Sequence, residues 1–242
     1  AEQYPSDPEE AFINTGLCWF DMESLNFYLK KQREEKRVPE RVRFQESEGK
    51  AEIIPTSSGE LRIWERPKEG HHYAIAADIA TGRGDDFSAA YVISLDTMKW
   101  VGEYHASIDP DLYAVHLYYI GRFYNDAWIA PEMGGGFGEP VVNSLRDGRG
   151  IRPPYRNLYR HLVGARVDRK EHATYGYPMT ERTRGQALKV MESFLRERAF
   201  EWMPPDLIAE MRTFVSQRRG PSPRAQDGCN DDRVMAAGIA CV

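Results

Sequence analysis

The sequence has few cysteines and no long apolar run. Its three cysteines, Cys18, Cys229 and Cys241, are odd in number and show no Cys-x-x-Cys spacing, so neither a disulfide framework nor a zinc cluster is indicated. No apolar run approaches the roughly 18 residues of a membrane span, and the first residues lack the basic start and apolar core of a signal peptide. We therefore expect a soluble protein with reduced thiols in a cytoplasm and no membrane partner.

The composition is that of a globular protein, with 242 residues, 41% hydrophobic and 29% charged. A net charge of −5 argues against a general nucleic-acid binder. The charge is unevenly distributed, however, because residues 1–60 carry 13 acids and 8 bases whereas residues 151–200 carry 11 bases and 5 acids. This basic half has two interpretations, a solvated surface or a contact with a polyanion.

The chain divides near residue 70. Residues 1–70 are charged and rich in turn residues without a sustained apolar pattern, which indicates a linker with short elements. Residues 71–242 read as one domain that begins with three strands, at about 73–79, 87–95 and 100–105.

Strands and helices alternate after this meander. Asp109-Pro110 supplies a helix start, with the helix expected to reach about Tyr124. A short strand follows over 127–130, and helices are expected over 137–145, 182–198 and 205–215, with a last one from about Asp231. The segment 151–180 is basic and turn-rich. This order predicts an α/β fold in which the meander pairs with parallel strands beginning at about Ala127.

Acidic residues stand in or beside apolar elements at three places, where an unpaired carboxylate is costly. Asp78 lies inside the run from Ala74 to Ala80, Glu132 ends the run from Ala127, and Asp231-Asp232 opens the last helix. Converging carboxylates need a cation, and two Mg²⁺ or Mn²⁺ ions held by oxygen ligands suit phosphodiester hydrolysis. Individually, Asp231 or Asp232 as a helix cap and Glu132 as a surface acid are equally simple interpretations.

These acids belong to motifs that resemble those of a known family, the nuclease domain of tailed-phage large terminases. The matching blocks run in order through the chain: Tyr73-x-x-x-x-Asp78-x-Ala80-x-Gly82-x-Gly84-x-Asp86-x-Ser88, Ala130-Pro131-Glu132, Gly176-Tyr177-x-x-Thr180 and Asp231-Asp232-x-Val234-Met235-Ala236. The opening segment from Tyr4 to Phe12 is similar to the end of the ATPase domain that precedes such nucleases.

The resemblance implies a ribonuclease H-like fold, a mixed central sheet flanked by helices after an N-terminal linker. It implies two-metal cleavage of concatemeric viral double-stranded DNA during genome packaging in the host cell cytoplasm. Expected partners are the ATPase domain of the same polypeptide, the portal protein and the small terminase subunit.

The sequence departs from the family at three points. Tyr177 stands where tryptophan is common, and Asn230 where histidine is frequent before the Asp pair. No Gly-x-x-x-x-Gly-Lys-Ser/Thr motif is present, so we expect the nuclease part of a longer polypeptide, without its motor.

Within the site we expect Asp78 to bridge both metals and Glu132 to complete the shell of one. Adjacent helical side chains diverge by about 100°, so a single member of the Asp pair should face the cluster steadily. Asp232 is favoured, and Asp231 is expected to cap the helix or to serve as an outer or second ligand. Asp86 is expected to act as a turn residue.

The basic residues are expected to contact DNA phosphates without reading sequence. The candidates are Arg152, Arg156, Arg160, Arg166, Arg169, Lys170, Arg182, Arg184, Arg218, Arg219 and Arg224.

Two other functions remain open. An actin-like or sugar-kinase-like ATPase is suggested by Asp78-x-x-x-Gly82-x-Gly84, although that fold needs two such domains. The second alternative is a non-catalytic DNA-binding module, in which the acidic residues have only a structural role.

Overall fold

A mixed sheet forms the centre of the computed structural model, which describes residues 18–47, 50–84, 86–148, 153–163, 172–216 and 222–242. The strands are β1 (Glu40–Ser47), β2 (Lys50–Pro55), β3 (Leu61–Ile63), β4 (Tyr73–Asp78), β5 (Ser88–Ser94), β6 (Lys99–Ala106) and β7 (Trp128–Pro131). They lie in the order β2-β1-β3-β6-β5-β4-β7. All neighbours are antiparallel except β4 and β7, which run parallel. The predicted meander and its parallel partner are therefore confirmed.

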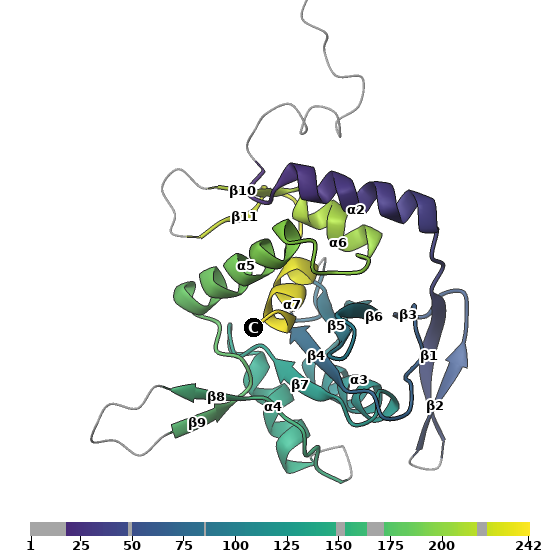
Figure 1. Ribbon diagram of the computed structural model, residues 1–242. Helices are drawn as coiled ribbons and strands as arrows, with labels where there is room; N and C mark the ends of the chain where they lie inside the picture. The colour runs from purple at the N-terminus through teal and green to yellow at the C-terminus, as the bar shows by residue number, and fades with distance from the viewer. Residues whose placement is uncertain (1–17, 48–49, 85, 149–152, 164–171, 217–221) are drawn as a thin grey trace, which may run out of the picture.

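Helices cover both faces of this sheet (Figure 1). They are α2 (Met22–Glu35), α3 (Pro110–Phe123), α4 (Gly138–Asp147), α5 (Glu181–Arg196), α6 (Pro205–Met211) and α7 (Asp232–Ala240). Helices α3 and α4 pack in one apolar core with one face of the sheet, and α2, α5, α6 and α7 pack in a second core against the other. None of the helices within the described ranges is both long and apolar enough to cross a membrane.

Strand β5 shows how one strand serves both cores. All seven of its residues are buried, with Ala90 and Val92 in the core beneath α3 and Ala89, Tyr91 and Ile93 in the core beneath α7. The alternation follows from the two-residue side-chain period of a strand. A strand that is buried on both faces has a continuous apolar sequence, and for this reason the strand could be predicted from the sequence.

Local sequence signals set where several helices begin. Pro110 starts α3 at its first turn, where a missing N–H costs nothing. Thr180 and Thr183 form a capping box at the start of α5, and Asp21 accepts a hydrogen bond from Ser24 N at 2.8 Å at the start of α2. These caps satisfy backbone donors that have no partner inside the helix.

The region before residue 70 differs from the predicted linker. Residues 22–35 form α2, and the strands β1, β2 and β3 extend the central sheet. In β1 the apolar residues Val42 and Phe44 point inward between the exposed Arg41 and Arg43. Because the charged side chains of this strand alternate with apolar ones and face solvent, the segment lacks the continuous apolar run by which the buried strands were predicted.

Two small hairpins also differ from the sequence expectation. The pairs β8 (Arg160–Val163) with β9 (His172–Tyr175) and β10 (Phe214–Val215) with β11 (Arg224–Ala225) are antiparallel. The helix expected over 205–215 ends at Met211, because Phe214 begins β10. Short strands with few apolar residues carry too little periodicity to be recognised from the sequence.

Candidate metal centre

Two of the predicted acids lie at neighbouring strand ends. Asp78 ends β4, and Glu132 directly follows β7. The parallel register pairs Ala77 with Pro131, and the Glu132 backbone N–H donates to Ala77 O at 2.8 Å. Asp78 and Glu132 therefore belong to the same sheet, as predicted, and to its carboxyl edge, where open α/β sheets hold their ligands.

Helix α7 brings the other two acids to this edge. It packs against β4 and β5, with Asp231 as its N-cap residue and Asp232 as its first residue. Both aspartates are half-buried, as are Asp78 and Glu132. Acids far apart in sequence are therefore placed on one side of the fold by a strand pair and a helix start.

The carboxylates act on one another electrostatically. The pKa of Asp78 is raised well above its usual range, first by burial and then by a hydrogen bond to the Glu132 side chain and by the charges of Glu132, Asp232 and Asp231. Burial and the charges of Asp231 and Asp86 raise the pKa of Asp232 to about 7, against the opposing effect of Arg233. Such mutual repulsion is what a bound cation relieves.

A turn beside Asp78 carries a further acid. Asp86 accepts hydrogen bonds from Thr81 N at 2.8 Å and Thr81 Oγ1 at 2.7 Å. These bonds close the loop between β4 and β5, as expected of a turn residue. The charge of Asp86 also reaches Asp232, so this turn contributes to the negative potential of the site.

The glycines after Glu132 keep the neighbouring backbone close. A Cβ on Gly134 would lie 2.3 Å from Glu132 Oε1, and one on Gly138 would lie 1.9 Å from Glu132 O. A Cβ at Gly134 would displace the Glu132 side chain, and a Cβ at Gly138 would displace the Glu132 backbone. The turn from β7 into α4 therefore needs glycine at both positions to keep Glu132 in place.

Tyr177 fixes the other side of the β7 end. Its N–H donates to Pro131 O at 2.7 Å, and its carbonyl accepts from Met133 N at 2.7 Å. The buried ring donates its hydroxyl hydrogen to Thr183 O at 2.9 Å. The backbone around Glu132 is thus held on both sides.

The acids fit a divalent cation by their chemistry. In the described ranges no group of three or more His, Cys, Asp or Glu side chains has an arrangement that holds a metal ion. The Glu132 side chain raises the pKa of the Asp78 carboxyl, after the larger effect of burial. A cation at this place would find carboxylate oxygens, the ligands that hard divalent ions prefer.

The basic residues predicted to contact DNA differ in solvent exposure and in their side-chain partners. Arg184 is largely buried and donates to Asp231 Oδ2 at 3.0 Å and to Pro223 O at 3.2 Å. Arg156 and Arg182 are exposed, Arg160 stacks on the Tyr175 ring at 4.8 Å, and Arg224 pairs with Glu181 at 3.1 Å. The remaining candidates lie outside the described residues: Arg152, Arg166, Arg169, Lys170, Arg218 and Arg219.

Sequence reasoning did not identify three charged residues behind α7. Arg233 donates to Glu103 Oε1 at 2.8 Å and lies 3.5 Å from Glu210. Glu103 is fully buried inside β6. An acid inside an apolar strand is the same signal that pointed to Asp78, so Glu103 was recognisable from the sequence; Glu210, on a short helix, was not.

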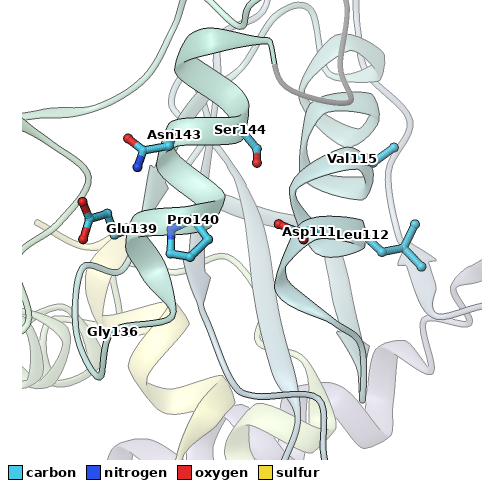
Figure 2. Close-up of a pocket in the computed structure, with 8 residues that line it drawn as sticks. All are labelled: Asp111, Leu112, Val115, Gly136, Glu139, Pro140, Asn143 and Ser144. Atoms are coloured by element: carbon cyan, nitrogen blue, oxygen red, sulfur yellow. The ribbon is translucent and has the colours of Figure 1, made fainter.

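A groove beside the acidic edge contains none of the predicted ligands. It has a volume of about 770 Å³ between α3 and α4 (Figure 2). Its lining combines apolar and acidic side chains: Asp111, Leu112, Val115, Gly136, Glu139, Pro140, Asn143 and Ser144.

Comparisons with known proteins give structural matches only. No protein-family model and no curated protein matches the sequence. The large terminase nuclease of thermophilic phage G20c matches with a TM-score of 0.56 at 17% identity, over 83% of this chain and 91% of that one. The same nuclease with bound magnesium matches with a TM-score of 0.58 at 16% identity, over 83% and 90%.

The nuclease domain of the Thermus phage P74-26 large terminase matches with a TM-score of 0.55 at 17% identity, over 76% of this chain and 86% of that one. These matches agree with the topology, a mixed sheet flanked by helices. The protein has the ribonuclease H-like fold of phage large terminase nuclease domains, the fold that its sequence motifs indicated.

Proposed function

We propose that this protein is a metal-dependent endonuclease that cuts concatemeric viral double-stranded DNA during genome packaging, as the nuclease domain of a large terminase. The proposal is supported by the place of Asp78 and Glu132 at the ends of one parallel strand pair, and by the charges of Asp231 and Asp232, at the start of α7, that act on Asp78. The structural neighbours are large terminase nucleases, and one of them has bound magnesium. The acids are strand-end and helix-start residues, so the scaffold rather than a mobile side chain sets their positions.

Each acid has a role that follows from its place. Two divalent ions, Mg²⁺ or Mn²⁺, would neutralise the charge that builds up on the phosphate and provide a nucleophile from water. Asp78, on which the charges of Glu132, Asp232 and Asp231 all act, would bridge both ions. Glu132 would complete one shell and Asp232 the other. Asp231, paired with Arg184, would be an outer or second ligand.

The DNA would lie along the basic half of the chain. Arg156, Arg160 and Arg182 are exposed and available for phosphates, whose recognition is independent of sequence. The same proposal assigns the ATPase domain of the polypeptide, the portal protein and the small terminase subunit as partners, in the host cell cytoplasm.

Incubation of the purified protein with supercoiled plasmid tests this function. With Mg²⁺ or Mn²⁺ and no nucleotide, we expect nicked and linear products that EDTA abolishes. An actin-like or sugar-kinase-like ATPase would instead hydrolyse ATP and leave the plasmid intact. A non-catalytic DNA-binding module would shift the plasmid on a gel without cutting it.

A further inference from the structure

Helix α7 receives its N-terminal cap from another helix. The Glu210 side chain, on α6, is 7% exposed, and its Oε1 accepts the backbone N–H of Val234 at 2.9 Å. Val234 is the third residue of α7, and its N–H is one of those left without a partner inside a helix. Glu210 therefore does for α7 what an N-cap side chain normally does.

The residue at the N-cap position does not perform this task. Asp231 makes no side-chain cap hydrogen bond, contrary to one of its two expected roles. Arg184 donates to the Asp231 carboxylate at 3.0 Å and holds it outside the helix end. Because Glu210 supplies the cap, the Asp231 carboxylate does not have to turn back onto the helix.

A second tie fixes the same helical turn to the sheet. Arg233, the neighbour of Asp232, donates its Nε hydrogen to Glu103 Oε1 at 2.8 Å, and its guanidinium lies 3.5 Å from Glu210 Oε2. Glu103 is fully buried on β6. The two residues that follow Asp232 are thus tied to other elements, Val234 through its backbone to α6 and Arg233 through its side chain to β6.

We infer that Glu210 is a positioning residue, which fixes the first turn of α7 and thereby the direction of the Asp232 carboxylate toward the proposed cation site. This inference rests on the proposed function and adds to it a residue outside the ligand set. Groups that orient metal ligands affect metal affinity or activity by about ten- to a hundredfold. Glu210 acts through the Val234 N–H, so an oxygen acceptor at this position is what the role requires.

The test compares three variants of the full chain. Glu210→Met keeps the length of the side chain and removes the strong acceptor, whereas Glu210→Gln keeps an oxygen acceptor. Glu192→Met is the matched control, because Glu192 is also a buried glutamate that accepts a backbone N–H, from Asp21 at 3.3 Å, but it joins α5 to the start of α2 and not to α7. Measurements are hydrogen exchange at Val234, Mn²⁺ affinity without DNA, and the kcat and KM of cleavage.

We expect Glu210→Met to expose the Val234 amide to exchange, to weaken Mn²⁺ binding by about tenfold and to lower kcat with little change in KM for DNA. Glu210→Gln should restore all three values to within about twofold of wild type, by the same argument. Glu192→Met should lose stability without weakening Mn²⁺ binding. Should Glu210→Met fail to fold, Glu210→Ala takes its place in the comparison.

Two results would overturn the inference while leaving the proposed function intact. In the first, the wild type is active and the Glu210→Met variant has the same Mn²⁺ affinity and the same kcat as the wild type. The other is a Glu192→Met control that weakens Mn²⁺ binding as much as Glu210→Met, since both losses would then reflect general destabilisation. A wild type that neither binds Mn²⁺ nor cuts DNA would overturn the proposed function, and the inference with it.

Discussion

Glu132 N–H donates to Ala77 O at 2.8 Å, and this one backbone bond fixes the distance between the two strand ends that carry Asp78 and Glu132. The bond belongs to the parallel pairing of β4 with β7. The proximity of the two strand ends is therefore a property of the sheet and does not depend on the protonation of the two side chains. The following predictions test what this arrangement does.

Asp78→Asn should lower Mn²⁺-dependent plasmid cleavage by roughly a hundredfold or more, since it removes the charge placed to bridge the ions. In EDTA the same variant should unfold at a higher temperature than wild type, with a gain of about 1 kcal/mol, because repulsion among the carboxylates is relieved. Cleavage assays and thermal denaturation measure the two effects.

The control for this variant is Glu139→Gln. Glu139 is exposed on α4, and its side chain points away from α3 (Figure 2), so its neutralisation should change neither the cleavage rate nor the unfolding temperature. Cleavage by Asp78→Asn at the wild-type rate would end the two-metal proposal.

Arg182 and Arg184 should behave differently although they are two residues apart. Arg182 is exposed, so Arg182→Gln should reduce the slope of log affinity for DNA against log salt by about 1. Arg184 is held by Asp231 and Pro223, so Arg184→Gln should leave that slope unchanged and cost about 2 kcal/mol of stability. Binding isotherms at several salt concentrations separate the two. A fall in slope for Arg184→Gln would make it a DNA contact instead.

Gly134→Ala should impair metal-dependent cleavage without altering DNA affinity. The new Cβ would meet Glu132 Oε1 at 2.3 Å and Met179 Cβ at 2.9 Å, which forces the Glu132 side chain out of its position. Gly185→Ala is the control, because the nearest atom to its Cβ lies at 3.5 Å; in helix α5 it should be neutral or stabilise by up to about 1 kcal/mol. Equal activity of the two variants would contradict the role given to Gly134.

His105 should make the fold sensitive to acid. Burial, followed by the charges of Arg233 and Arg62, lowers the pKa of His105 from its ordinary value of 6.5 to about 4. Between these values the unfolded chain binds the extra proton, so stability present at pH 7 is lost as the pH falls. The loss from this group is up to about 2 kcal/mol at pH 5.

His105→Phe isolates this contribution from the many acids that titrate in the same range. The new ring can keep the stacking on Phe87, whose ring centre lies 4.7 Å from that of His105. Urea denaturation at pH 7 and pH 5 should show a smaller loss for the variant than for wild type. An identical pH dependence in both proteins would exclude His105 as the cause.

The elements from β4 to β7 could be predicted because buried strands and amphipathic helices leave strong periodic patterns. Asp78 and Glu132 were recognisable as acids in or beside apolar runs, and Asp232 as part of a helix start. The strand β1 was missed because its outward side chains are charged, and the β8–β9 hairpin because its strands have four residues each.

The cap from Glu210 to α7 could not be predicted at all. Glu210 and Val234 are 24 residues apart, and nothing in the spacing of the chain relates a residue of one short helix to the first turn of another. Only tertiary packing brings the two together. The pairing of Arg184 with Asp231 could not be predicted either. Arg184 belongs to a basic segment, so its sequence context predicts a contact with DNA phosphate and not an ion pair within the protein.

The most direct measurement of the central claim is an anomalous diffraction experiment on a crystal of the protein soaked in Mn²⁺. The account predicts Mn²⁺ peaks among the carboxylates of Asp78, Glu132 and Asp232, with two ions about 3.5 to 4 Å apart, and none in an Asp78→Asn crystal. Anomalous density absent from this edge of the sheet at saturating Mn²⁺, in a crystal that leaves it open to solvent, would contradict the claim that these acids form the metal centre.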